Sequence, residues 1–261
     1  MDIKILIATH KKYKMPKYKY YLPIHVGKEG KDSIGYIGDN TGENISYKNK
    51  YYCELTALYW GWKNLKTDYI GIVHYRRHLS SKSLLNKIFS KKEDLILSDY
   101  DIEELVKKYE VILPRKRNYF IENIYDHYAN THYKEHLDIT REIIDEYMDE
   151  YLISYDKVMK CKKAHMFNMF IMNKKLADEY SEWLFFILSK LELRINIEDY
   201  NDFQARLFGR VSEILLNVWI DKNQISYKEI GHIHLEKINW IDKGTKFLKA
   251  KYMNKKYEKS F

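Results

Sequence analysis

The chain has 261 residues and a formal net charge of +8, from 45 lysines and arginines against 37 aspartates and glutamates. Its apolar runs, such as 183–188, are far shorter than the roughly 20 residues that a membrane-spanning helix needs. Two cysteines are too few for a disulfide framework, and no signal-peptide core follows Met1. These features argue against a transmembrane channel, a secreted protein and a zinc ribbon, and we expect a globular protein of the reducing cytoplasm.

The positive charge is concentrated at the end of the chain. Residues 243–261 contain seven lysines and one acid, Glu258, and account for +6 of the net charge. Apolar residues that include Phe247, Leu248, Tyr252 and Met253 lie among these lysines. A short amphipathic segment on an anionic phospholipid surface is therefore expected, although nucleic acid or a solvated chain end fits the charge equally well. We place a boundary here between a folded domain, 1–242, and a basic tail, 243–261.

The first half of the chain predicts strands separated by loops and one helix. Residues 3–9 and 69–74 are short apolar, β-branched runs, typical of buried strands. Residues 22–26 predict an edge-like strand, because Pro23 cannot donate a ladder hydrogen bond. The next stretch is rich in glycine, aspartate and asparagine, which is typical of a loop. From about 50 to 64, apolar residues recur at helical spacing and predict one continuous helix.

The second half repeats the alternation. It predicts strands at 110–113, 165–172 and 227–235, and helices at 101–109, 121–136, 138–151, 174–191 and 200–221. Alternating strands and helices favour a mostly parallel sheet with helices on both faces. No repeat or linker divides this part of the chain, so we expect a single α/β domain.

The first candidate site follows the first strand. Ligands of open α/β sheets gather at the carboxyl ends of strands, where Thr9, His10 and Lys11 offer a hydroxyl, an imidazole and a cation to a nucleotide. An ordinary polar strand end is the alternative. Neither G-x-G-x-x-G nor G-x-x-x-x-G-K-[ST] occurs, so a Rossmann dinucleotide site and a P-loop have no support.

The second candidate is a polar loop that leads into the expected helix. Its glycines, amides and hydroxyls, over 38–46 and at Asn49, are compatible with turn chemistry alone. The helix that follows is apolar nearly all round, yet it carries Glu54. A buried carboxylate costs several kcal/mol unless it is paired. Glu54 therefore needs a cation or several hydrogen-bond donors, and Arg76 and Arg77 are the nearest candidates.

The third candidate is the run His74-Tyr75-Arg76-Arg77-His78, which ends the strand at 69–74. Two planar guanidinium groups at the carboxyl end of a strand suit two-pronged recognition of phosphate. Strand alternation places His74 and Arg76 on one face, with Tyr75 and Arg77 on the other. A structural pairing of the arginines with Glu54 and another acid is the alternative.

We expect no metal site. Asp99 and Asp101 have the D-x-D spacing of metal-dependent sugar transfer, but they also open a helix, where acids act as caps. Several histidines lie close together in sequence without an H-E-x-x-H motif, which argues against zinc: His127, His132, His136, His232 and His234. Basic and aromatic residues are common, but no nucleic-acid reader motif is present.

Seven ordered segments resemble the signature of one family: ATHK, PIHVG, GDNTGENIS, YYCELTALYWGWKN, DYIGIVHYRRHL, NMFIMNKKLADEYSEWLFFIL and RLFGRVSEILLNVWI. The family comprises bacterial capsular and exopolysaccharide biosynthesis glycosyltransferases, long catalogued as a domain of unknown function; some members transfer galactofuranose from its UDP derivative. The resemblance covers about residues 1–222, and its ELTALYW…HYRR block is highly specific. It implies a GT-A-like fold, a nucleotide-sugar donor and inversion at the anomeric carbon.

The resemblance also implies where the donor binds. ATHK would hold the nucleotide base, and the polar loop with Asn49 would line the ribose and diphosphate. HYRR would supply cations at the strand end where metal-dependent relatives carry acids. The predicted donor-binding residues are Thr9, His10, Lys11, Asp39, Asn40, Asn44, Ser46, Asn49, Glu54, His74, Tyr75, Arg76, Arg77, Asn168 and Arg206.

We expect a carboxylate to be the general base, because inverting transfer needs a group that takes the proton of the acceptor hydroxyl. Glu213 matches a family glutamate and is the first candidate. Asp199 and Asp202, which precede it in the sequence, are the alternatives. For Glu213, a purely structural salt bridge to Arg206 or Arg210 is the competing interpretation.

These features together predict a cytoplasmic hexosyltransferase that uses a UDP-linked or other nucleotide-diphospho-sugar. It would extend a lipid-linked saccharide at the inner membrane face, in capsule, exopolysaccharide or O-antigen synthesis. Arg76 and Arg77 would stabilise the leaving diphosphate without a metal, with Mn²⁺ or Mg²⁺ on Asp99 or Asp101 as the alternative. Two competing hypotheses are a non-catalytic nucleotide- or saccharide-binding module of a capsule assembly complex and a basic RNA-binding protein. The favoured interpretation includes no nucleic acid.

Overall fold

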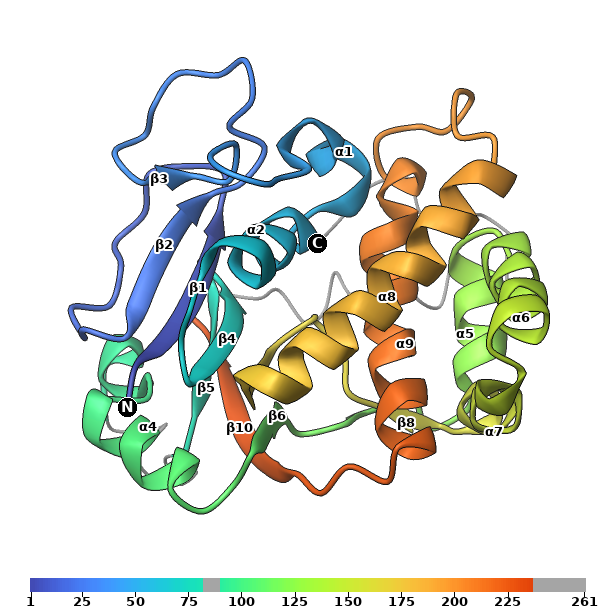
Figure 1. Ribbon diagram of the computed structural model, residues 1–261. Helices are drawn as coiled ribbons and strands as arrows, with labels where there is room; N and C mark the ends of the chain where they lie inside the picture. The colour runs from blue at the N-terminus through green and yellow to red at the C-terminus, as the bar shows by residue number, and fades with distance from the viewer. Residues whose placement is uncertain (82–89, 237–261) are drawn as a thin grey trace.

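The computed structural model describes residues 1–81 and 90–236, so the predicted basic tail, 243–261, and the boundary before it lie outside the described residues. In the described part, helices flank an eight-stranded sheet, and a two-stranded sheet lies beside it (Figure 1). The strand order of the large sheet is β3-β2-β1-β4-β5-β10-β6-β9, and β4 also pairs with β9. The fold is therefore a mixed α/β domain built on one central sheet.

Most strands follow the apolar runs of the sequence. Two have the predicted bounds, β1 (Ile3–Thr9) and β4 (Tyr69–His74). Phe167 and Asn168 have φ of 82° and 48°, which a strand residue does not adopt, so β9 begins later than predicted. The remaining strands are β2 (Tyr21–His25), β3 (Ile37–Gly38), β5 (Arg77–Ser80), β6 (Val111–Pro114), β7 (Arg117–Asn118), β8 (Lys163–Ala164), β9 (Phe170–Asn173) and β10 (Lys228–His234).

The prediction of a mostly parallel sheet is wrong, because the sheet is mixed. β1 pairs in parallel with β2 and β4, β2 with β3, and β6 with β10. The pairs β4–β5, β4–β9, β5–β10 and β6–β9 are antiparallel. β5 follows β4 after a short turn that reverses the chain, and β9 lies against both β4 and β6. The predicted edge strand β2 also has β3 beyond it, at Ile24 and His25.

The helices differ from the predicted ones mainly at their ends. The expected helix 138–151 ends earlier, and a 3₁₀ turn at Asp149–Tyr151 leads into a further helix, α7. No helix in the described part of the chain is long and apolar enough to cross a bilayer. The bounds are α1 (Asn49–Tyr52), α2 (Leu55–Asn64), α4 (Asp99–Val106), α5 (Ile124–Thr131), α6 (Glu135–Tyr147), α7 (Leu152–Lys160), α8 (Lys174–Arg194) and α9 (Leu207–Lys222).

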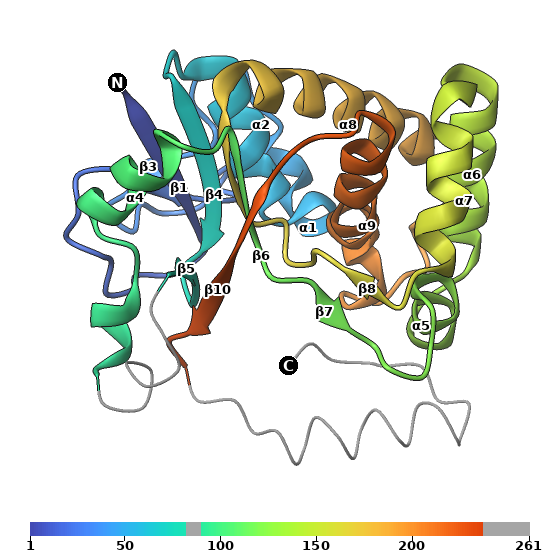
Figure 2. The ribbon, with the colours of Figure 1, turned by 90° about the horizontal axis from the view of Figure 1, so that it is seen from below.

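The two faces of the sheet carry separate hydrophobic layers, because successive strand side chains point to opposite faces. Leu6 and Phe170 belong to the layer that also holds apolar residues of α2, α8 and α9. Ile5 and Ile171 belong to the layer that holds apolar residues of α4. Figure 2 shows α4 on one side of the sheet and α8 and α9 on the other. The packed sheet fixes the strand ends from which the candidate site is built.

Candidate functional site

The carboxyl ends of β1 and β4 form the first part of the site. These strands are adjacent and parallel, with Ala8 opposite His74, so the residues that follow them lie side by side. The rings of His10 and Tyr75 meet edge to face, with centroids 5.4 Å apart, and Lys11 Nζ lies 5.0 Å from the Tyr75 ring centre. The structure thus brings together two of the sequence-predicted clusters.

The turn after β4 corrects the predicted facing of the side chains. His74 at the end of β4 pairs with Arg77 at the start of the antiparallel β5. Residues directly opposite in an antiparallel pair share a face, so His74 and Arg77 point the same way instead of to opposite faces. Arg76, in the turn, forms an ion pair with Glu236, with 3.6 Å between Nη1 and Oε2. The sequence pattern treats this run as continuous strand and misses the reversal.

His74 and Arg77 each carry a buried nitrogen atom at the turn between β4 and β5. His74 Nδ1 and Arg77 Nε have no hydrogen-bond partner within residues 1–81 and 90–236. Burial, followed by the charge of Arg77, lowers the pKa of His74 to about 2, so its imidazole is neutral. Burial also lowers the pKa of Arg77, although attraction to Glu213 opposes this effect. A buried donor without a partner is costly, and a bound anion would satisfy Arg77 Nε.

A break in the expected helix positions Glu54. Cys53 has φ 54° and ψ −129°, so the helix predicted at 50–64 ends as α1 and resumes as α2. Asn49 stabilises the break, since its Nδ2 donates to Cys53 O at 2.7 Å and to Thr56 Oγ1 at 3.1 Å. Glu54 therefore lies at the start of α2 instead of inside a continuous helix. Strained backbone of this kind is concentrated at functional sites.

Asn168 connects Glu54 to α9. Because β9 runs antiparallel to β4, the residues before β9 lie near the carboxyl end of β4. Asn168 Nδ2 donates to Glu54 Oε1 at 2.9 Å and to a backbone carbonyl of α9 at 2.8 Å, and its Oδ1 accepts from Ser212 Oγ at 2.9 Å. An amide thus bonds to Glu54, for which the sequence predicts either a cation or several hydrogen-bond donors. The charges of Arg77 and Arg206 act on the same carboxylate through space.

The start of α9 contributes three charged residues that are spaced by about one helical turn. Arg206, Arg210 and Glu213 therefore share one side of the helix. Arg206 Nε donates to Cys53 Sγ at 3.1 Å. The Arg210 guanidinium lies 4.2 Å from the ring centre of Phe203, and its Nη1 atom is buried without a hydrogen-bond partner in the described residues. α9 thus places further cations beside Glu54 and Glu213.

Glu213 has the environment of a general base. Its side chain is only partly exposed. Burial and the nearby charge of Glu54 raise the pKa of Glu213 to about 7, while the charge of Arg77 and a hydrogen bond from the Phe167 backbone oppose the increase. A carboxylate that titrates near neutral pH is well matched to accepting a proton from a hydroxyl group.

The predicted donor-binding loop uses its polar groups to hold itself together. Asp39 is fully buried and accepts from the backbone N–H of Gly27 at 2.8 Å and of Lys28 at 3.1 Å. The Ser46 hydroxyl also donates to Asp39, and the Ser46 N–H donates to Asn44 Oδ1 at 3.1 Å. These side chains are therefore engaged in the loop itself.

Three other predicted donor-binding residues lie in this framework. Thr9 is buried, and its hydroxyl donates to Lys11 O at 2.7 Å. Asn40 is half-buried beside Gly38, and Asn49 holds the break between α1 and α2. The residues that meet at the strand ends are His10, Lys11, Glu54, His74, Tyr75, Arg76, Arg77, Asn168 and Arg206.

The alternative bases do not join this cluster. Asp199 is exposed in the loop before α9. The Asp202 side chain is 94% exposed and forms an ion pair with Lys50, with 3.3 Å between Oδ1 and Nζ. Of the three predicted carboxylates, Glu213 is the one that lies among the arginines.

Two residues that the sequence analysis did not single out interact electrostatically with Glu213. The positive charge of Arg117 acts on Glu213. Burial raises the pKa of Tyr119 to about 12, with a smaller contribution from the charge of Glu213. Both belong to the segment after β6, which carries no motif; its basic run at 115–117 is the signal that could have found them.

Asp99 and Asp101 do not fit a metal site. Asp101 accepts from the Ser98 N–H at 2.9 Å in a capping box at the start of α4, which confirms the predicted role as a cap. Asp99 accepts from the N–H groups of Lys19 at 3.2 Å and Tyr20 at 3.3 Å. Lys19 and Tyr20 precede β2, so they lie at the amino ends of the parallel strands β1 and β2, opposite the carboxyl ends that form the site. Across the described residues, no three His, Cys, Asp or Glu side chains are grouped to hold a metal ion.

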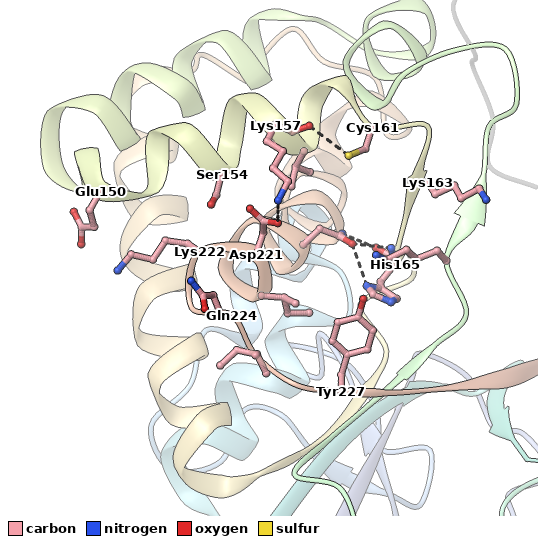
Figure 3. Close-up of a pocket in the computed structure, with 15 residues that line it drawn as sticks. Glu150, Ser154, Lys157, Cys161, Lys163, His165, Asp221, Lys222, Gln224 and Tyr227 are labelled. Carbon is pink, nitrogen blue, oxygen red and sulfur yellow. Dashed lines mark hydrogen bonds and ion pairs between the residues drawn. The ribbon is translucent and has the colours of Figure 1, made fainter.

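A separate pocket of ≈ 740 Å³ surrounds the carboxyl end of α9 (Figure 3). Its wall includes the buried His165, whose Nε2 lies 2.8 Å from Glu229 Oε1 and whose backbone N–H donates to Asn217 Oδ1 at 2.8 Å. Asn217 also donates to the backbone carbonyl of Glu213 at 2.9 Å, so the pocket and the arginine cluster share α9. Four lysines line the pocket: Lys116, Lys157, Lys163 and Lys222.

Comparisons relate the chain to known proteins. The apo structure of the bifunctional glycosyltransferase WbbM is similar, with a TM-score of 0.83 and 33% sequence identity. The similarity covers 91% of this chain and 46% of that chain, so this chain spans less than half the length of WbbM. No curated protein matches the chain. The family described as a domain of unknown function (DUF4422) matches residues 4–224, and the chain belongs to this family.

Proposed function

We propose that this chain is a glycosyltransferase that moves a sugar from a nucleotide-diphospho-sugar to a saccharide acceptor. The observation that carries the proposal is a pair of half-buried arginines near Glu213, whose pKa is raised to about 7. Arg77 Nε and Arg210 Nη1 are buried and have no hydrogen-bond partner in the described residues. The guanidinium groups suit a diphosphate, and the carboxylate suits a proton acceptor. The similarity to WbbM, which is named a glycosyltransferase, supports the same reaction class.

In the proposed reaction, the donor diphosphate binds the arginines at the end of β4 and the start of α9. Glu213 takes the proton of an acceptor hydroxyl, whose oxygen then forms a bond to the anomeric carbon from the face opposite the diphosphate. The bond between that carbon and the diphosphate oxygen breaks, and its electron pair leaves with the nucleoside diphosphate. The anomeric configuration is therefore inverted. Fixed cations stabilise the negative charge that grows on the leaving group.

The proposed transfer is independent of a metal ion. The oxygens of Asp99 and Asp101 are engaged by backbone N–H groups away from the arginines. Arg77 and its neighbours carry permanent charge at the strand end where a metal would otherwise act. We expect turnover to be unchanged in excess EDTA; complete loss that Mn²⁺ or Mg²⁺ restores would contradict this part of the proposal.

The finer assignments follow the resemblance of the HYRR-containing segments. We propose a UDP-linked donor, with galactofuranose as the first sugar to test, and a lipid-linked acceptor of capsule, exopolysaccharide or O-antigen synthesis at the inner membrane face. The basic tail, 243–261, is proposed to hold the protein on anionic lipid; it lies outside the described residues, so its support is its composition.

The direct test is a panel of nucleotide sugars offered to the purified protein, with released nucleotide as the readout. The proposal predicts release from at least one donor and titratable binding of the matching nucleoside diphosphate. Binding of nucleoside diphosphate without release on any donor and acceptor would favour a non-catalytic binding module. RNA affinity that falls steeply with salt, without nucleotide affinity, would favour the RNA-binding alternative.

A further inference from the structure

We propose that the β7–β8 ribbon and the loop that follows β7 form a surface that binds an anionic lipid bilayer. This inference rests on the proposed function in one respect, since it assumes that the saccharide acceptor is carried by a lipid. The surface belongs to the folded domain and is distinct from the basic tail.

The ribbon brings two basic segments of the chain side by side. In the antiparallel pairing of β7 with β8, Asn118 lies opposite Lys163, and the Tyr119 N–H donates to Lys162 O at 2.9 Å. The acid that follows in sequence, Glu122, is buried and accepts from Asn130 Nδ2 at 3.1 Å. The exposed cations of the two segments are Arg115, Lys116, Arg117, Lys160, Lys162 and Lys163.

Two large apolar side chains are exposed directly after β7. Phe120 is 75% exposed and Ile121 is 68% exposed. Phe120 has φ 57°, so the chain turns sharply at the tip of this loop. Adjacent exposed apolar residues flanked by cations match an interfacial segment, in which the apolar groups enter the acyl boundary and the cations contact anionic headgroups. A polyanion such as RNA would account for the cations but not for Ile121.

The surface lies next to the proposed general base. Tyr119, which precedes the exposed pair, lies against His127 with ring centroids 4.1 Å apart, and the charge of Glu213 helps to raise the pKa of Tyr119. Lys116 and Lys163 line the pocket at the carboxyl end of α9, and the ribbon passes beside that pocket (Figure 3). A bilayer at this surface would present a lipid-linked saccharide to Glu213 while its lipid stays in the membrane.

The test is sedimentation of the full chain with phosphatidylcholine vesicles that contain about 30% phosphatidylglycerol, at about 0.1 M salt. Lys116→Gln with Lys163→Gln should weaken binding about thirtyfold, because each cation near an anionic surface contributes about fivefold. Phe120→Ser with Ile121→Ser should weaken binding by about tenfold or more. Turnover on a soluble acceptor analogue and the melting temperature should stay at wild-type values in both variants.

Matched controls carry the same changes elsewhere. Ile153, 83% exposed on α7, is replaced in Ile153→Ser, and the exposed Lys108 and Lys175 are replaced by Gln. These variants should bind vesicles like the wild type. All variants keep the basic tail, so wild-type binding by both ribbon variants would overturn the proposal and assign membrane contact to other residues.

Two further outcomes are informative. If the ribbon variants lose binding to a single-stranded RNA oligonucleotide and keep vesicle binding, the surface is a nucleic-acid site and the lipid proposal is wrong. If the wild type transfers no sugar from any donor, the proposed function fails, while the vesicle comparison still decides whether the ribbon binds lipid.

Discussion

Two regions with similar polar residues differ in how their hydrogen bonds are used. In the loop around Asp39, one buried carboxylate accepts from two backbone N–H groups and the Ser46 hydroxyl. At the ends of β4 and the start of α9, buried nitrogens of His74, Arg77 and Arg210 have no partner in the described residues. The first region uses its polar groups to stabilise a fold, and the second keeps donors available.

This difference distinguishes residues that hold the structure from residues that we propose act on a ligand. The buried polar groups around Asp39 are occupied by one another, whereas the buried guanidinium nitrogens of Arg77 and Arg210 leave donors for a ligand. At the second site, positive charge and a carboxylate of raised pKa occur together, and the proposed reaction, with its diphosphate leaving group and proton transfer, would account for both. The Asp39 loop would then shape the site without reacting in it.

The largest expected effect comes from the base. Glu213→Gln keeps the size and shape of the side chain but cannot accept a proton, so turnover should fall about 10²- to 10⁴-fold. Titration with nucleoside diphosphate should show nearly unchanged affinity, because the arginines remain. Asp202→Asn is the control, with an exposed carboxylate 3.3 Å from Lys50. If Asp202→Asn removes turnover and Glu213→Gln does not, the assignment of the base is wrong.

The next largest expected effect is on the affinity for the nucleoside diphosphate. Arg77→Ala should weaken binding of the nucleoside diphosphate about 10- to 100-fold, because a charge-assisted hydrogen bond contributes about 1.5–3 kcal/mol. Arg77→Lys should restore little of it, since an ammonium cannot form the two-pronged contact. Arg141→Ala removes an arginine that pairs with Asp156 at 2.8 Å and should not change nucleotide affinity. Wild-type affinity in Arg77→Ala, measured by calorimetry, would leave Arg77 with a structural role.

Several strands and many charged residues of the candidate site can be predicted from the sequence, because they depend on local patterns. The bounds of β1 and β4 come from apolar runs, and the half-buried carboxylate Glu54 stands out in an apolar segment. Arg206, Arg210 and Glu213 share a helix side by spacing alone. These patterns predict which residues carry charge into the site.

The rest depends on contacts between distant segments. No local rule shows that Cys53 adopts a positive φ, that the chain reverses after His74, or that β9 inserts against β4 and β6. The same holds for Asp39, whose partners Gly27 and Lys28 are remote from it in sequence. A polar loop residue therefore looks the same in sequence whether it binds a ligand or its own backbone.

A third prediction tests the structural role of the Asp39 loop. Asp39→Ala removes the acceptor of two buried N–H groups and a hydroxyl, so the free energy of unfolding should fall by about 1–3 kcal/mol. Turnover per folded molecule should change far less than in Glu213→Gln. Asp32→Ala, in the exposed part of the same loop, should leave stability unchanged. Denaturant unfolding measures both; a stable Asp39→Ala protein without nucleotide affinity would place Asp39 in the binding site instead.

The smallest expected effect is on stability, and it has a defined sign. Burial raises the pKa of Glu213 to about 7 from its ordinary value of 4.5, so between these pH values the folded state binds the proton more tightly than the unfolded state. Stability from this group is therefore present at low pH and is lost as the pH rises through about 7. Glu213→Gln removes that loss, and its melting temperature should exceed that of the wild type by a few degrees at about pH 8 and equal it near pH 4. Glu182→Gln, on an exposed position of α8, should show no such difference.

Equal melting temperatures for Glu213→Gln and the wild type at both pH values would mean that the Glu213 carboxylate is solvated and that its pKa is not held near neutral pH, as a base requires. A higher melting temperature at high pH together with lost turnover would show that the ionised Glu213 carboxylate lowers the stability of the fold but is needed for turnover. The Asp39 carboxylate, by contrast, is expected to raise stability.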